Sequence, residues 1–244
     1  MPPTLTIAKR ELGSYFNSPI AYVVICLTQL LLGVLFFFVR NFWQVDKASL
    51  ASLFELAPFG LCLLVIPVIT MRLIAEEKSS GTLEMLITLP VRDWEVVLGK
   101  YLGALGLVAI LLVSTLVYPL MMFVFPWKLG PIDFGPVWSG YLGLTLMSAA
   151  AVAVGLLVSA FTKSQVIAFF VTLVVNFFFV FMHWIGDHVA GPKLGLVLSY
   201  VGFQQHIANF ARGLIDSRSV VYFASITVVS LMVAFRALES RKWR

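Results

Sequence analysis

The stretch RLIAEEKSSGTLEMLITLP, from Arg72 to Pro90, is a compact block of charge inside an otherwise strongly apolar sequence. Apolar runs long enough to cross a bilayer lie on both sides of it, Leu56 to Ile74 before it and Val96 to Phe125 after it. Thr82 has the side chain of a helix N-cap, and the pattern predicts a short helix over residues 83–89 that the final proline ends. We therefore expect a short charged helix between two membrane spans, and we expect a partner outside the membrane to bind this helix.

The composition is that of an integral membrane protein. Hydrophobic residues make up 60% of the chain and charged residues 12%, against roughly 45–50% and about 25% in soluble domains. Mean hydropathy is +0.97, and several uncharged runs reach the ~20 residues that a spanning helix needs. The formal net charge of +5 comes from residues at the ends of these runs, which form no patch suited to nucleic acid.

The whole chain, residues 1–244, is expected to form one all-α transmembrane domain. Apolar residues at helical spacing, with basic residues on other faces, predict an interfacial helix over residues 1–18. Ser18 and Pro19 then supply an N-cap and a first-turn proline for the first span. The six predicted spans cover about residues 19–39, 56–74, 96–125, 137–161, 166–185 and 219–238.

Three features predict how the spans pack. Pro67 lies inside the second span, which is expected to kink and to pack against protein because proline leaves a carbonyl without its usual donor. Gly99 and Gly103 either let another backbone approach the third span or reflect the ordinary glycine frequency of membrane helices. The fourth span is rich in small residues and is expected to be central.

Residues 186–218 predict two short helices at the outer leaflet. The stripe Phe203, Ile207, Phe210 and Leu214 needs burial, yet neither helical piece is long enough to cross about 30 Å of hydrocarbon. We expect this segment to be an outer gate that lets an amphipathic or lipid-linked cargo leave. The candidate gate residues are Phe203, His206, Phe210, Arg212 and Asp216. Arg212 and Asp216 could instead form only a local i,i+4 pair on a helix.

The distribution of basic residues predicts the orientation. Six spans place both termini on one side of the membrane. Of the 17 Lys and Arg, eleven lie near the termini, the charged block and the turn between spans four and five, and six lie on the other side. The positive-inside rule then predicts N-in and C-in, with residues 76–90 in the cytoplasm.

An enzyme and a channel were weighed as alternatives. Membrane proteases that cleave prenylated proteins have paired glutamates, as in Glu76-Glu77, but Gly81 stands where those enzymes have an arginine. His183 and His188 are five residues apart and do not share a helical face, and the chain contains no G-x-x-x-x-G-K-[ST] phosphate loop. We therefore expect a non-catalytic subunit that holds no metal and no cofactor.

A channel needs polar groups inside its spans. The interiors offer Thr28, Gln29, Asn176 and scattered hydroxyls. Gln29 and Asn176 are expected to form interhelical hydrogen bonds in preference to an ion path. A channel or a scaffold component of a larger complex remains the alternative function.

The chain resembles type-2 ABC exporter permeases, and more closely the subgroup of gliding-motility and nitrous-oxide-reductase-maturation permeases. The string E-E-K-x-x-G-T-x-E with the following L-P carries the most specific part of this resemblance. The other segments that carry it are Lys9 to Leu12, Val91 to Glu95, Gly140 to Gly143, Phe210 to Asp216 and Leu238 to Arg241.

The resemblance implies a bacterial inner-membrane permease that works as a dimer, with a second copy or a related subunit, in contact with membrane lipid. It also implies separate cytoplasmic ATPase subunits that bind ATP and Mg. A coupling helix in the first cytoplasmic loop would dock on the ATPase, with the N-terminal interfacial helix lying against the same subunit. The implied coupling residues are Glu76, Glu77, Lys78, Gly81, Thr82 and Glu84, supported by Lys9, Arg10 and Glu11. The simpler reading of Glu76, Glu77 and Lys78 is a solvated boundary cluster.

Overall fold

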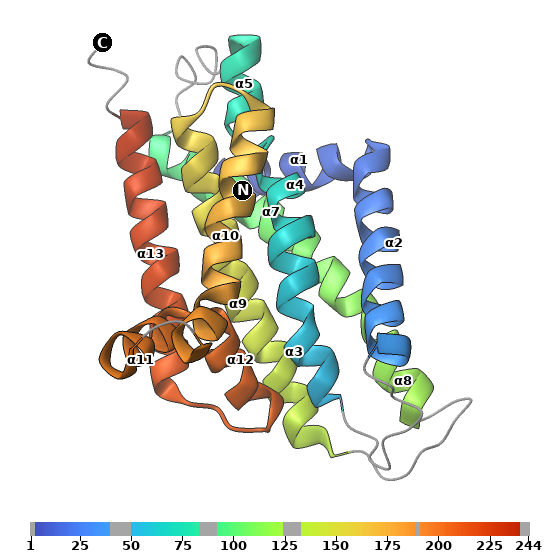
Figure 1. Cartoon of the computed structure of the whole chain (residues 1–244). Helices are drawn as coiled ribbons and strands as arrows, with labels where there is room; N and C mark the ends of the chain where they lie inside the picture. Colours follow the sequence, from blue (N-terminus) through green and yellow to red (C-terminus); the bar gives the residue numbers. More distant parts are fainter. Residues whose placement is uncertain (1–2, 40–49, 83–91, 124–132, 189–190, 240–244) are drawn as a thin grey trace.

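A computed structural model describes residues 3–39, 50–82, 92–123, 133–188 and 191–239, and its regular elements are helices (Figure 1). Six helices in the described residues are long and apolar enough to cross a membrane, as the sequence predicted. They are Pro19–Phe38, Ala51–Ser80, Asp93–Met122, Phe134–Phe161, Gln165–His188 and Ser217–Glu239.

The elements follow one another along the chain with short connections. In chain order they are α1 (Pro3–Phe16), α2 (Pro19–Val34), η1 (Leu35–Val39), α3 (Ala51–Gly60), η3 (Leu61–Val65), α4 (Ile66–Thr70), α5 (Ala75–Ser80), α7 (Asp93–Ser114), α8 (Val117–Phe123), α9 (Phe134–Phe161), α10 (Gln165–His188), α11 (Pro192–Val201), α12 (Phe203–Ala211) and α13 (Ser217–Glu239).

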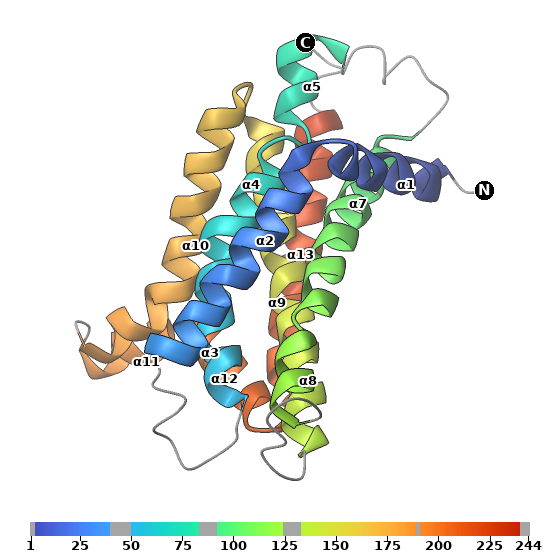
Figure 2. The same cartoon turned by 90° about the vertical axis from the view of Figure 1, so that its right-hand side faces the viewer.

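The two ends of the bundle differ. α1 lies across one end, together with α5, the start of α7, the turn between α9 and α10, and the last turn of α13 (Figures 1 and 2). We call this the α1/α5 end. The short helices α11 and α12 lie at the opposite end, which we call the α11/α12 end. The segments that the sequence assigned to opposite sides of the membrane are therefore separated by the length of the spans.

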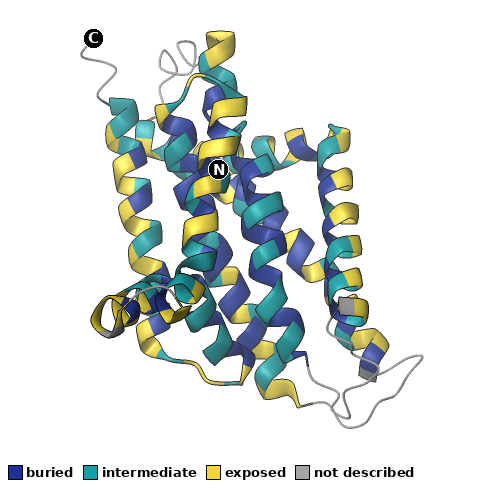
Figure 3. Cartoon of the chain, viewed as in Figure 1, coloured by how far each residue is buried: buried dark blue, intermediate teal, exposed yellow. Residues whose placement is uncertain are grey.

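α9 is the central helix, as its small residues predicted. Its most apolar 18-residue stretch is 67% buried, as is that of the second span, against 17% for α13 and 22% for α10. Figure 3 shows the exposed positions on the outer helices. A Cβ on Gly143 would lie 2.7 Å from Phe210 Cβ, and one on Gly140 would collide with the Phe54 ring. Glycine at these positions lets neighbouring side chains reach the α9 backbone.

The second span is irregular, and its irregularity begins just before Pro67. η3 is a π-helical segment in which Ile66 N–H donates to Leu61 O, five residues earlier. In this register the next donor, to Cys62 O, would be residue 67, which as proline has no N–H. Asn176 of α10 donates its Nδ2 to that carbonyl at 3.1 Å. The predicted kinked, protein-packed span is confirmed, and Asn176 serves as an interhelical hydrogen bond.

Other local predictions are confirmed at the first and third spans. Ser18 caps α2 by accepting from Ile20 N–H at 3.3 Å, with Pro19 in the first turn. Gln29 Nε2 donates to Ser114 Oγ at 2.5 Å and so joins α2 to α7. The third span is interrupted at residues 115–116, between α7 and α8, and Pro119 in the first turn of α8 has no N–H to donate to Thr115 O.

Residues 191–218 contain two short helices, as predicted, but the second ends earlier than the stripe required. α12 ends at Ala211, and Gly213 adopts a left-handed φ of 89°. Leu214 is consequently outside the helix and 61% exposed within the single chain, so its predicted place on the helical stripe is wrong. The predicted helical i,i+4 relation of Arg212 and Asp216 is also wrong. Asp216 instead caps the start of α13, where its Oδ1 accepts from Arg218 N–H at 2.9 Å.

Candidate functional site

The candidate site is built around α5, which follows a break in the second span. The helical pattern is interrupted at residues 71–74 before α5 begins. Ser159 Oγ of α9 accepts from Ile74 N–H at 3.1 Å and from Ala75 N–H at 3.0 Å, which satisfies two of the free donors at the α5 N-terminus. Lys78 Nζ donates to Ala160 O. α5 therefore rests on the end of α9 and is not a rigid extension of α4.

α5 ends at Ser80, and Gly81 turns the chain after it. Gly81 has φ 73°, the left-handed conformation that closes many helices and that glycine adopts without strain. Ser80 Oγ and Thr82 Oγ1 are 2.8 Å apart, and both residues are exposed. The short helix predicted over residues 83–89, including Glu84, lies outside the described residues.

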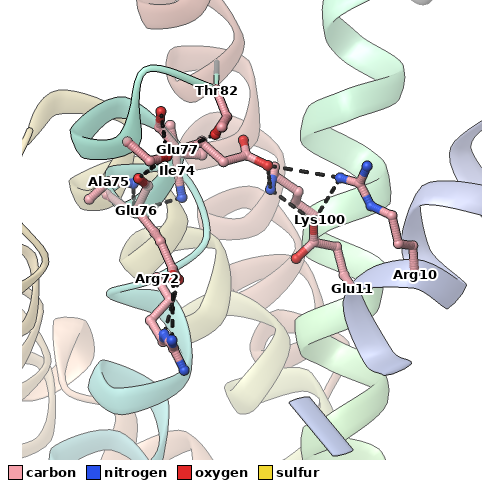
Figure 4. A network of polar contacts seen from close by, with 11 residues as sticks. Arg10, Glu11, Arg72, Ile74, Ala75, Glu76, Glu77, Thr82 and Lys100 are labelled. Atoms are coloured by element: carbon pink, nitrogen blue, oxygen red, sulfur yellow. Dashed lines mark hydrogen bonds and ion pairs between the residues drawn. The ribbon is translucent and has the colours of Figure 1, made fainter. Parts of the chain in front are cut away.

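The two adjacent glutamates point in different directions (Figure 4). Glu76 accepts from Arg72 Nε at 3.0 Å and from Arg72 Nη2 at 3.2 Å, and its side chain is 43% exposed. Glu77 turns inward and is only 16% exposed. A purely solvated boundary cluster does not describe Glu77, because its carboxylate is part of an internal ion network.

The centre of that network is Lys100 of α7, which sequence reasoning did not select. Its side chain is 2% exposed, and its Nζ lies 2.7 Å from Glu77 Oε1 and 2.9 Å from Glu11 Oε1. Arg10 Nη2 adds contacts of 3.4 Å to Glu11 Oε1 and 3.9 Å to Glu77 Oε1. We call Arg10, Glu11, Glu77 and Lys100 the Lys100 node. A lysine inside an apolar helix is the signal that could have found it, because such a charge requires a partner.

α1 reaches Lys100 because the neighbouring positions on α7 are glycines. A Cβ on Gly99 would lie 2.7 Å from Ile7 Cβ, and a Cβ on Gly103 would lie 2.6 Å from Glu11 Cβ. Close packing, one of the two readings of these glycines, is therefore confirmed, and the approaching backbone is that of α1. Lys9 lies on the exposed face of α1, together with Leu5, which is 53% exposed.

Tyr15 anchors the other end of α1 on the second span. Its hydroxyl donates to Ile69 O at 2.9 Å, and the side chain is buried. Burial, with a further contribution from the nearby Glu11 carboxylate, raises the pKa of the Tyr15 phenol well above its usual value. The phenol therefore stays neutral and keeps its proton for this hydrogen bond.

A polar pocket of about 330 Å³ opens beside the Lys100 node. Its charged lining is balanced, with three basic side chains and three carboxylates. Glu77 Oε2 is buried without a hydrogen-bond partner among the described residues. The lining residues are Arg10, Glu11, Ser14, Tyr15, Arg72, Glu76, Glu77 and Lys100.

A comparison with protein-family models decides the family. A model described as "ABC-2 family transporter protein" matches residues 38–235, which include α3 to α12 and most of α13. The chain belongs to the ABC-2 transporter family. It is thus a membrane permease component of an ABC transporter, a family that implies a partner ATP-binding subunit. No curated protein matches the chain.

At the α11/α12 end of this ABC-2 permease, the predicted gate residues divide into buried and exposed groups. Phe203 and Phe210 are fully buried and His206 is 3% exposed, whereas Arg212 is exposed. Phe203 stacks on Phe179 of α10, with ring centroids 4.7 Å apart. The three aromatic side chains thus fasten α12 to the spans.

His206 is held on both ring nitrogens. Nε2 lies 2.9 Å from Tyr200 O and Nδ1 lies 2.9 Å from Ser219 Oγ. Since a carbonyl only accepts, Nε2 carries the proton and Nδ1 accepts from the serine. Burial lowers the pKa of His206. The imidazole therefore links α11, α12 and α13 in its neutral form.

Proposed function

We propose that this permease is the transmembrane subunit of an ATP-driven exporter, driven by separate cytoplasmic ATPases that dock at the α1/α5 end and bind ATP and Mg. The observation that carries the proposal is α5 itself. It is a short charged helix, broken from its span, braced by α9 and tied to α1 through Lys100. Such an element can transmit a push from outside the membrane to several spans at once.

The described residues that the resemblance implied for coupling divide into an exposed group, which includes Lys9, and an internal group. Ser79, Ser80 and Thr82 are exposed and available to a partner, together with Arg10 and Glu76. Glu77 and Glu11 face Lys100 instead and act as internal braces. Lys78 is engaged with the end of α9.

The proposal includes dimerisation, in a bacterial inner membrane, with a second copy or a related permease. The outer faces of α2, α10 and α13 support it, since no more than 28% of their apolar windows is buried within one chain. These faces are available to lipid and to another permease. The transport pathway would then form between two bundles, with α11 and α12 closing its outer end to an amphipathic or lipid-linked cargo.

Affinity purification of the native complex tests the function. We expect the tagged permease to bring down a P-loop ATPase in equal number and to support ATP hydrolysis. Ser79→Arg should reduce recovery of the ATPase, because a bulky charge at the docking surface clashes with the partner. Ser217→Arg is the matched control, an equally exposed serine at the α11/α12 end. A native complex with no ATPase would favour a channel or scaffold component.

A further inference from the structure

The Lys100 node joins three elements that are distant in sequence. Lys100 is on α7, Glu77 is on α5, and Glu11 is on α1. The node contains two basic and two acidic side chains, so its formal charge is balanced. Arg10, 58% exposed, lies at its solvent side, whereas the ammonium group of Lys100 is enclosed (Figure 4).

The burial of Lys100 makes its partners obligatory. A buried ion is costly unless it is paired and hydrogen-bonded, and removing one partner leaves the other uncompensated. Both carboxylates lie within 2.9 Å of Nζ. If α1 or α5 moved away from α7 alone, its glutamate would lose its ion pair with Lys100 and Lys100 would lose one of its two partners. The two short helices are held to each other mainly through this atom, with a longer direct contact of 3.9 Å between Arg10 Nη2 and Glu77 Oε1.

The surroundings make the node a junction between a movable part and a fixed part. The break at residues 71–74 separates α5 from the second span. α1 packs onto α7 at Gly99 and Gly103, on either side of Lys100 in the sequence. The pocket of about 330 Å³ beside the node gives the Glu77 carboxylate room to shift. A displacement of α5 that breaks its contacts with the end of α9 is therefore transmitted to Lys100 and, through Lys100, to α1.

We propose that Lys100 is a positioning residue that makes α1 and α5 respond as one unit to the ATPase, so that a partner that displaces α5 also moves the helix lying across the span ends. This inference rests on the proposed function. Lys100 itself touches neither ATPase nor cargo, because its side chain is enclosed.

Hydrogen exchange on the permease–ATPase complex, with and without a non-hydrolysable ATP analogue, tests the proposal. Lys100→Met removes the charge at similar length but leaves the two carboxylates with only their longer contacts to Arg10. The variant Glu11→Gln/Glu77→Gln/Lys100→Met therefore replaces the three inward-facing members of the node with neutral side chains of similar size and leaves the exposed Arg10 in place. Lys100→Arg keeps the charge, and Lys163→Met removes an exposed lysine from the turn between α9 and α10 at the same end.

In the native permease and in Lys163→Met, the nucleotide analogue should change exchange in α1 and α5 together. In the neutral triple variant the ATPase should remain bound and exchange in α5 should still change with the analogue. The change in α1 should fall to less than about a fifth of its native size. Lys100→Arg, which keeps the charge, should show the native response in both helices. If Lys100 only stabilised the fold, the triple variant would change hydrogen exchange in the absence of the nucleotide analogue. The analogue would still change exchange in α1 and in α5 together. An unchanged α1 response in the triple variant overturns the proposal.

The same measurement without ATPase separates this inference from the proposed function. If the native complex contains no ATPase, the proposed function fails. The permease alone still decides whether Lys100 ties the two helices. Lys100→Met should speed exchange in α1 and in α5 by about tenfold or more, since hydrogen bonds to charged groups are strong. Faster exchange in only one of the two helices, or in neither, contradicts the tie.

Discussion

At the scale of single residues, two amide side chains inside the bundle each donate to a specific acceptor on a neighbouring helix. Asn176 donates to Cys62 O, and Gln29 joins Ser114. Unsatisfied polar groups are costly in the apolar interior of a membrane protein. These amides thus stabilise irregular or paired helices and need no role in an ion path.

The pairing of Asn176 with the carbonyl freed by Pro67 predicts a double-mutant effect. Asn176→Leu should destabilise the permease by about 1–2 kcal/mol, because Cys62 O loses its donor. In a Pro67→Ala background, residue 67 regains an N–H that can reach this carbonyl, so the same change should cost clearly less. Unfolding midpoints in detergent measure both costs. Equal costs in the two backgrounds would show that the proline and the asparagine are unrelated.

His206 predicts a pH dependence at the α11/α12 end. Because burial lowers its pKa in the folded state, the unfolded chain binds the proton first as the pH falls below the ordinary value of 6.5. Stability should be full above that pH and should decline below it, until the folded state is protonated as well.

The measurement is the unfolding midpoint at pH 7.5 and at pH 5.5. His206→Gln should show a smaller difference between the two than the native chain. The exposed His188, changed to glutamine, serves as the control and should leave the difference intact. A native-like difference in His206→Gln would assign the pH dependence to other groups.

At the scale of elements, the packing of α1 on α7 decides how the candidate site is assembled. The helices meet at glycines, so their backbones approach more closely than side chains would allow. The approach brings Glu11 to Lys100. Gly99 and Gly103 of α7 thus determine the position of the Glu11 side chain on α1.

Alanine substitutions on α7 test this contact. Gly103→Ala should push α1 away, since the added Cβ would lie 2.6 Å from Glu11 Cβ and 3.1 Å from Ala8 O, and overpacking of this kind costs about 1–3 kcal/mol. Exchange in α1 should rise. Gly106→Ala is the control, because its nearest neighbour is Leu12 Cδ1 at 3.5 Å, an ordinary contact. Equal behaviour of the two variants would contradict the close approach.

At the scale of the whole molecule, the spans could be predicted from the sequence because hydrophobic length is a local property. The Ser18 cap and the central α9 followed from local patterns too. The Lys100 node could not be assigned in the same way, since its contacts join residues 23 and 89 positions apart. The helical position of Leu214 was mispredicted because Gly213 turns the chain after α12.

The separation of the two ends predicts the accessibility of engineered cysteines. With the α1/α5 end in the cytoplasm, a cysteine at Ser79 should react with a membrane-impermeant maleimide only after the cells are opened. A cysteine at Asp133, at the start of α9, should react from outside in intact cells. Intact-cell labelling at position 79 would invert the orientation and place α5 out of reach of a cytoplasmic ATPase.

The central claim is that an ATPase binds at α5, and site-specific photo-crosslinking tests it most directly. A photoreactive phenylalanine derivative at Ser79 should capture the ATPase in native membranes. The same derivative at Ser217, an exposed serine at the opposite end, should capture none. Crosslinks from position 217, or none from position 79 in a complex that contains the ATPase, would contradict the account.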